Sequence, residues 1–143
     1  MSEVFALNRY LEAQENVYAR VLSELRAGKK TTHWIWFIFP QIAGLGYSLT
    51  AKKYAIQSIE EAYAYLKHDL LGKRLRECTE LVLAIEGNDI DQVFGYPDNL
   101  KFRSCMTLFN EVADDNNCFK KAIEQFFSGE PDEKTLEILK KTG

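Results

Sequence analysis

Apolar side chains recur at helical spacing between residues 71 and 87, and this periodicity constrains the fold more than any other feature of the sequence. The series that repeats every three or four positions is Leu71, Leu75, Cys78, Val82 and Ile85. On an α-helix these side chains would share one face, which a globular protein buries. Gly87 follows the series, and glycine is the residue type that most often ends a helix.

The same spacing predicts helices along most of the chain. Segments with an apolar stripe or helix-start signals are residues 5–14, 17–25, 59–67, 98–112, 119–127 and 132–141, with a shorter helix in 88–97. Ser58 and Glu61 have the spacing of a capping box, which marks the start of one of these helices. We therefore expect an all-α fold, a compact single-domain multihelical bundle of about seven or eight short helices.

Residues 34–39, WIWFIF, are apolar on both faces, so periodicity alone fits a buried strand as well as a helix. No other segment offers a convincing strand partner, and an unpaired buried strand would leave backbone groups without hydrogen bonds. We expect a central, aromatic-rich helix around which the others pack. Trp34 and Trp36 are two positions apart, so on a helix they point in different directions and at most one lines a site.

The length of the chain and its net charge constrain its domain organisation and the class of its partners. The 143 residues contain no linker-like stretch, so we expect residues 1–143 to form one domain. A net charge of −3 argues against nucleic acid as a partner, unless the chain's lysines converge on one face. The N-terminus lacks a signal-peptide pattern, and no apolar run approaches the roughly 20 residues that span a bilayer. We expect a cytoplasmic protein without membrane contact.

The cysteines and histidines do not form a metal-binding pattern. Cys78, Cys105 and Cys118 are widely spaced, and none belongs to a CxxC pair. Neither His33 nor His68 lies near a cysteine at metal-ligand spacing. The pattern indicates reduced thiols that fill the core, and we expect neither a metal nor a cofactor.

Two blocks of sequence carry a family resemblance: HW-W-FPQ-GLG-S in residues 33–48 and YPD-KF-S-M-LF in residues 96–109. Over nearly its whole length the chain resembles the bacterial family called domain of unknown function 1810. The resemblance implies a compact multihelical fold and brings no established activity or catalytic residues. The layout is also similar to that of the helical YbiA-like proteins, which are linked to NAD and ADP-ribose chemistry. Their acidic motif has no residue-by-residue match here.

The first block holds residue types that a small-molecule site needs. His33 is a candidate acid/base catalyst, because histidine transfers protons near neutral pH. Trp36 offers a stacking surface, and the Gln41 amide can read a base edge. The alternative interpretation is a hydrogen-bonded histidine at a helix start, with the tryptophans filling the core.

A glycine loop and an arginine complete the candidate site. Gly44 and Gly46 would let the backbone approach a phosphate, and Ser48 precedes a helix start, where anions are favoured. Their spacing matches neither a P-loop nor a dinucleotide fingerprint, and a tight turn with a capped helix explains the same residues. Arg103 suits bidentate recognition of phosphate, or pairs with a surface carboxylate.

Two functions follow from these features. The first is binding of a small phosphate-bearing or nucleotide/ADP-ribose-like ligand, with enzymatic turnover left open. The alternative is a non-catalytic protein–protein interaction module. A polar-lined pocket beneath residues 39–48 would favour the first, and a contiguous exposed apolar patch would favour the second. The oligomeric state is not predicted.

Overall fold

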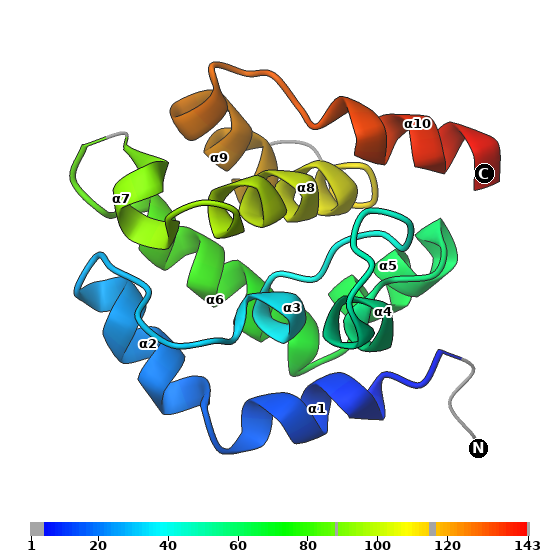
Figure 1. Cartoon of the computed structure of the whole chain (residues 1–143), viewed down its shortest axis with the longest axis horizontal. Helices are drawn as coiled ribbons and strands as arrows, with labels where there is room; N and C mark the ends of the chain where they lie inside the picture. Colours follow the sequence, from blue (N-terminus) through cyan, green and yellow to red (C-terminus); the bar gives the residue numbers. More distant parts are fainter. Residues whose placement is uncertain (1–4, 88, 115–116, 143) are drawn as a thin grey trace.

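The computed structural model describes residues 5–87, 89–114 and 117–142, and all the regular structure within these ranges is helical. The helices in chain order are α1 (Asn8–Glu15), α2 (Tyr18–Arg26), α3 (Ile35–Ile38), α4 (Leu49–Tyr54), α5 (Ile59–Lys67), α6 (Leu71–Leu83), α7 (Ile90–Phe94), α8 (Asp98–Asn110), α9 (Cys118–Phe127) and α10 (Glu133–Thr142). Helices α1 and α2 lie on one side of the molecule and α8, α9 and α10 on the other (Figure 1). None of the described helices has the length and apolar character needed to cross a bilayer.

The all-α class is confirmed, but the described residues form ten helices where seven or eight were expected. The difference concerns short elements: α3, α4 and α7 contain four, six and five residues, and α3 and α7 fall within segments where a central helix and a shorter helix were expected. A helix of that length has too few turns to repeat an apolar stripe, so periodicity cannot count such elements reliably.

The longer helices follow their sequence signals closely. Helix α5 has the expected bounds, and the Ser58 hydroxyl accepts a hydrogen bond from the Glu61 N–H (3.1 Å) as a capping box requires. Helix α6 buries Leu71, Leu75 and three further side chains of its inner face, although it ends two residues before Ile85. Four of the five periodic positions therefore lie in the core, as predicted, and Ile85 is partly buried against it.

Helix α8 runs through the middle of the core. It packs against five other helices, α3, α5, α7, α9 and α10. The Phe102 ring lies 5.0 Å from the Phe39 ring and 4.8 Å from the Phe94 ring, measured between centroids. These aromatic contacts join α8 to α7 and to the end of α3 in one cluster.

The WIWFIF segment is helical only from Ile35 to Ile38, which corrects the expectation of a longer helix over residues 34–39. Phe39 precedes Pro40 and leaves the helical region (φ −124°, ψ 72°), as residues before proline tend to do. The short helix still lies between α1 and α8 (Figure 1), in contact with α1, α4, α6 and α8. Trp34 is buried and Trp36 is partly exposed, so the two indoles do point in different directions.

The chain after Pro40 is held by a β-bridge between Ile42 and Ile56. The Ile56 N–H donates to the Gln41 carbonyl, and the Ala43 N–H donates to the Ile56 carbonyl, both at 2.8 Å. The bridge closes residues 42–56 into a loop that contains the two glycines and α4. The position of that loop decides where the candidate site lies.

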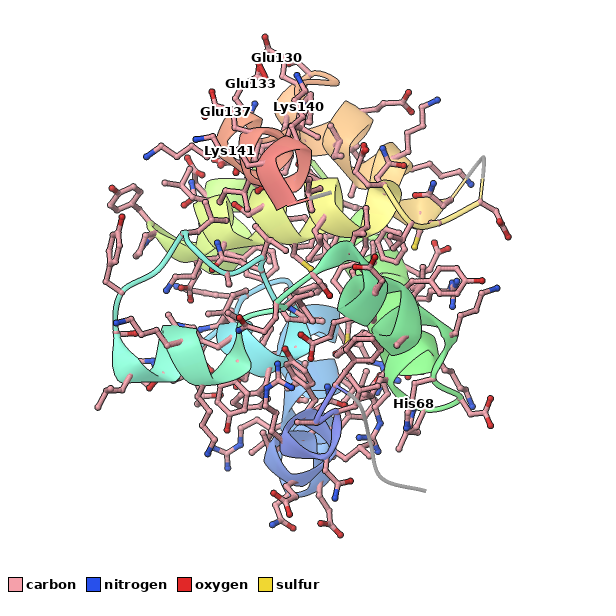
Figure 2. The ribbon with its side chains drawn as sticks, turned by 90° about the vertical axis from the view of Figure 1, so that its right-hand side faces the viewer. His68, Glu130, Glu133, Glu137, Lys140 and Lys141 are labelled. Carbon is pink, nitrogen blue, oxygen red and sulfur yellow. The ribbon has the colours of Figure 1, made fainter. Side chains whose placement is uncertain are left out.

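Helices α5 and α6 meet at a close backbone crossing. The His68 imidazole Nδ1 accepts hydrogen bonds from the N–H groups of Leu70 (3.1 Å) and Leu71 (3.2 Å), which caps the start of α6. Figure 2 shows His68 at this turn, far from the charged outer face of α10. A Cβ atom on Gly72 would lie 2.0 Å from the Leu66 carbonyl oxygen. Only glycine therefore permits this crossing.

We expect Gly72→Ala to destabilise the fold by about 3 kcal/mol, because a methyl group would be forced into a backbone carbonyl. Gly87→Ala is the matched control, since its Cβ would meet no atom within 4 Å and its cost of about 1 kcal/mol comes only from a positive φ of 84°. Urea unfolding measures both free energies. Equal losses for the two variants would contradict the close crossing.

Candidate ligand-binding groove

A buried carboxylate fixes the segment that leads into α3. Glu24, on α2, accepts hydrogen bonds at Oε1 from the backbone N–H of Thr31 (2.7 Å) and of Thr32 (3.1 Å), and from the Trp34 indole N–H (2.9 Å). Its Oε2 accepts from the Thr32 hydroxyl (2.6 Å). Four donors from residues 31–34 thus converge on one side chain, and the entry to α3 has a defined position.

The protonation of Glu24 reflects the same contacts. Burial raises the pKa of its carboxyl group, but hydrogen bonds from Thr32, Thr31 and Trp34 to the charged form outweigh burial and lower the pKa to about 2. The carboxylate is therefore ionised near neutral pH. A charged acceptor makes stronger hydrogen bonds than a neutral one, which strengthens its hold on the loop.

The other end of α3 is held by Gln14 of α1. Its Nε2 donates to the Phe37 carbonyl (2.7 Å) and to the Tyr65 hydroxyl (3.2 Å). Its Oε1 accepts from the guanidinium of Arg74 (3.2 Å). Glu24 and Gln14 together anchor both ends of α3, so the backbone that carries Trp36 is tightly constrained.

Two adjoining cavities lie beside α3. The first has a volume of about 210 Å³ and is lined by Trp36, Gln41, Ile42, Ala43, Gly44, Gly46, Ala51, Lys52, Tyr54, Ala55 and Gln57. The second has a volume of about 400 Å³ and is lined by Trp36, Gln41, Leu45, Gly46, Tyr47, Ser48, Ala51, Pro97, Leu100, Lys101, Ser104, Asp132 and Lys134. They share Trp36, Gln41, Gly46 and Ala51, and we refer to the pair as the groove.

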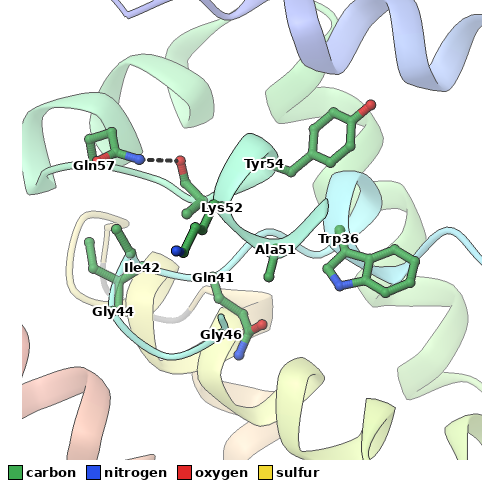
Figure 3. A pocket seen from close by; sticks show the side chains of 11 residues that line it. Trp36, Gln41, Ile42, Gly44, Gly46, Ala51, Lys52, Tyr54 and Gln57 are labelled. Atoms are coloured by element: carbon green, nitrogen blue, oxygen red, sulfur yellow. Dashed lines mark hydrogen bonds between the residues drawn. The ribbon is translucent and has the colours of Figure 1, made fainter. Parts of the chain in front are cut away.

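The shared wall of the groove offers an aromatic surface and an uncommitted amide. Gln41 lies beside Gly46, with its amide pointing into the open space (Figure 3). Within the described part of the chain this amide has no hydrogen-bond partner, although the Gln41 backbone carbonyl is used in the β-bridge. Trp36 stands at one end of the first cavity and Gln57 at the other (Figure 3). An amide free on both its donor and acceptor sides can read a polar ligand edge.

The glycine loop packs closely on its neighbours. Gly44 has a φ of 105°, and a Cβ atom there would lie 3.3 Å from the side chain of Ile138 on α10. A Cβ atom on Gly46 would lie 2.7 Å from the Ala51 Cβ. The glycines therefore allow contact with α10 and α4 and keep the groove open. The Ser48 hydroxyl caps α4 by accepting from the Ala51 N–H (3.0 Å).

The far wall of the second cavity comes from α8 and the start of α10. Asp132 Oδ2 accepts from the Ser104 hydroxyl (3.2 Å) and from the N–H (3.1 Å) and hydroxyl (2.6 Å) of Thr135. The Asp132 N–H donates to the Thr107 hydroxyl (2.8 Å). Asp132 is thus a helix cap whose carboxylate is already well bonded, which leaves Lys101 and Lys134 as the wall's cationic groups.

Five of the residues expected in the site lie together in the groove: Trp36, Gln41, Gly44, Gly46 and Ser48. His33 is exposed and lines neither cavity. Arg103 also lies outside them, because its Nε (3.0 Å) and one terminal nitrogen (2.8 Å) donate to the Glu130 carbonyl, with its guanidinium over the Phe127 ring. Arg103 holds the chain between α9 and α10, and so supports the far wall indirectly.

Lys101, Asp132 and Glu24 contribute to the groove or its support and were not predicted for the site. Two of these residues could have been found from the sequence. Lys101 falls in the YPD-KF-S-M-LF block, and Asp132 lies three positions before Thr135, which is the spacing of a helix cap. Glu24 could not have been found in this way, because nothing in the sequence distinguishes it from an exposed helical carboxylate.

The described residues contain no group of three or more histidine, cysteine, aspartate or glutamate side chains arranged to hold a metal ion. All three cysteines are buried and unpaired. Burial raises the pKa of Cys78 to about 12 and of Cys118 to about 11, and it raises that of Cys105 as well. Thiols with such pKa values stay protonated near neutral pH and are poor nucleophiles.

Fold and groove together define an all-α protein with one polar and aromatic depression beside a short central helix. The chain belongs to the family of proteins of unknown function DUF1810, whose model matches residues 4–139. This match confirms the family resemblance carried by the two sequence blocks.

A solved structure extends the comparison. The conserved hypothetical protein Rv1873 from Mycobacterium tuberculosis, with a crystal structure at 1.38 Å, is 48% identical to this chain. The similarity covers 96% of this chain and 99% of that one, with a TM-score of 0.94. No protein with a curated description matches the sequence.

Glu24→Gln removes the charge of the loop anchor while it keeps its shape, and we expect it to reduce stability by roughly 2 kcal/mol at neutral pH. Because the folded pKa of Glu24 lies below the ordinary value, its contribution is complete above about pH 4.5 and is lost as the pH falls towards 2. Urea unfolding from about pH 7 to about pH 3 should therefore show the two proteins converging at low pH. A difference that stays constant would contradict the assignment.

Proposed function

We propose that the groove binds a small molecule that combines a planar ring with an anionic group, as nucleotides and ADP-ribose-like compounds do. The observation that carries the proposal is the meeting of Trp36, the free amide of Gln41 and the cationic Lys101 around one opening. Each supplies one element of nucleotide recognition: a stacking surface, an edge reader and a counter-charge.

The size and charge of the groove support this proposal. Its larger cavity, at about 400 Å³, falls within the range of ordinary ligand pockets. Lys52, Lys101 and Lys134 line the two cavities, and Asp132, their acidic residue, is occupied as a helix cap. The surplus of positive charge favours an anion although the whole chain carries −3.

The proposal concerns binding, and the acid/base role of His33 remains a sequence prediction. His33 is exposed and separate from the groove, so it would reach a bound ligand only if the ligand extended beyond both cavities. We place the function in the cytoplasm, because three unpaired cysteines suit a reducing compartment.

A second candidate function is docking of a protein partner on the rim of the groove. Tyr47 (83% exposed) and Leu100 (45%) line the second cavity. Leu49 (87%), two positions after Tyr47, and Tyr96 (82%), next to Pro97 of the cavity wall, are also exposed. Large exposed apolar side chains that cluster in this way mark interaction surfaces. The ligand proposal is better supported, because docking alone does not explain the uncommitted amide of Gln41.

Titration with AMP, ADP and ADP-ribose, followed by calorimetry, tests the ligand proposal. We expect Trp36→Leu to weaken binding about tenfold or more through lost stacking. Gln41→Ala should weaken it about fivefold through a lost hydrogen bond. Tyr63→Ala, an exposed aromatic residue that lines neither cavity, should change nothing.

Absence of binding to the unmodified protein, or equal losses in Tyr63→Ala and Trp36→Leu, would contradict the proposal. A protein partner whose binding is lost on Tyr47→Ala or Tyr96→Ala, without any nucleotide effect, would favour the docking function instead.

A further inference from the structure

The Trp36 ring is covered on one face by a cation. Lys101, in the first turn of α8, places its Nζ 4.8 Å from the centre of the Trp36 ring. Both residues line the second cavity, so the ammonium group stands where a ligand ring would stack on the indole. A planar group that stacks on this face has to displace the ammonium, and the cation–π contact between Lys101 and Trp36 is then lost.

The ammonium of Lys101 has only part of a counter-ion. Its Nζ lies 3.5 Å from Asp98 Oδ1, while Asp98 Oδ2 lies 2.7 Å from the Nζ of Lys30. The Lys30 side chain is only 6% exposed, so its ion pair with Asp98 is strong and shielded from water. Two lysines therefore share one carboxylate, and this cluster keeps one positive charge in excess.

We infer that Lys101 is a specificity-determining residue that admits a planar ring to Trp36 only when the same molecule carries a phosphate. When the Lys101 ammonium moves off the indole, the ligand phosphate would form an ion pair with it. This ion pair offsets the lost cation–π contact and neutralises the excess positive charge. A neutral nucleoside would displace the Lys101 ammonium without forming such an ion pair, and therefore binds poorly. This inference rests on the proposed ligand-binding function and adds its selectivity.

Lys101 suits this role better than the other lysines of the groove. Its side chain is 24% exposed, whereas Lys52 and Lys134 are largely exposed to solvent. A partly buried cation interacts more strongly with a ligand anion than a fully hydrated one does. Lys101 also contacts the stacking surface directly, and neither of the other two is placed over Trp36.

The experiment compares AMP with adenosine by calorimetry on the full chain. The unmodified protein should prefer AMP strongly. Lys101→Met keeps the length of the side chain and removes its charge, so we expect AMP to bind about tenfold more weakly. Adenosine should bind about two- to fivefold more tightly, because no ammonium has to be displaced. Lys101→Arg should restore the preference for AMP.

Lys73→Met, at an exposed lysine of α6 that lines neither cavity, is the matched control and should leave the AMP-to-adenosine ratio within about threefold of the original. Thermal unfolding of each variant verifies that it folds. If the unmodified protein binds AMP and Lys101→Met leaves the ratio unchanged, the inference is overturned while the proposed function stands. If the unmodified protein binds neither AMP nor adenosine, the proposed function and the inference fall together.

Discussion

The hydrogen bonds that converge on the Glu24 carboxylate are the interaction on which the candidate site depends. A carboxylate is costly to bury unless donors surround it, and here Thr31, Thr32 and Trp34 supply them. Their common acceptor sits on α2, so a loop with no regular structure is tied to a helix. The four-residue α3 that follows could not hold itself in place, because so short a helix has little stability of its own.

The groove is built from parts of the chain that are distant in sequence. Trp36 and Gln41 come from α3 and the segment after it, Lys101 from α8, and Asp132 from the start of α10. The glycine loop joins these parts, since Gly44 packs on Ile138 of α10 while the β-bridge at Ile42 fixes its base. A ligand in the groove would therefore contact several elements at once, and its binding would stabilise their packing.

The sequence allowed the long helices to be predicted because their apolar stripes span several turns, as in α5 and α6. It could not give the length of α3, where WIWFIF is apolar throughout and the end depends on the backbone of Phe39 before Pro40. Chemical type also identified Trp36 and Gln41 as groove residues. Residue type also suggested Arg103 for the site, but its guanidinium binds the Glu130 carbonyl outside the groove. A guanidinium can bind a phosphate or a backbone carbonyl, and only the fold decides between them. The contribution of Lys101 needed the fold for the same reason.

The central claim, that Trp36 and Gln41 form one wall of a ligand site, is tested most directly by nuclear magnetic resonance during titration with AMP. The chain has two tryptophans, and the Trp34 indole N–H is buried against Glu24 while Trp36 faces the groove. The account predicts that the Trp36 indole and Gln41 amide signals shift with AMP, whereas the Trp34 indole signal stays near its original position. Shifts confined to residues outside the groove, or no shifts at millimolar AMP, would contradict it.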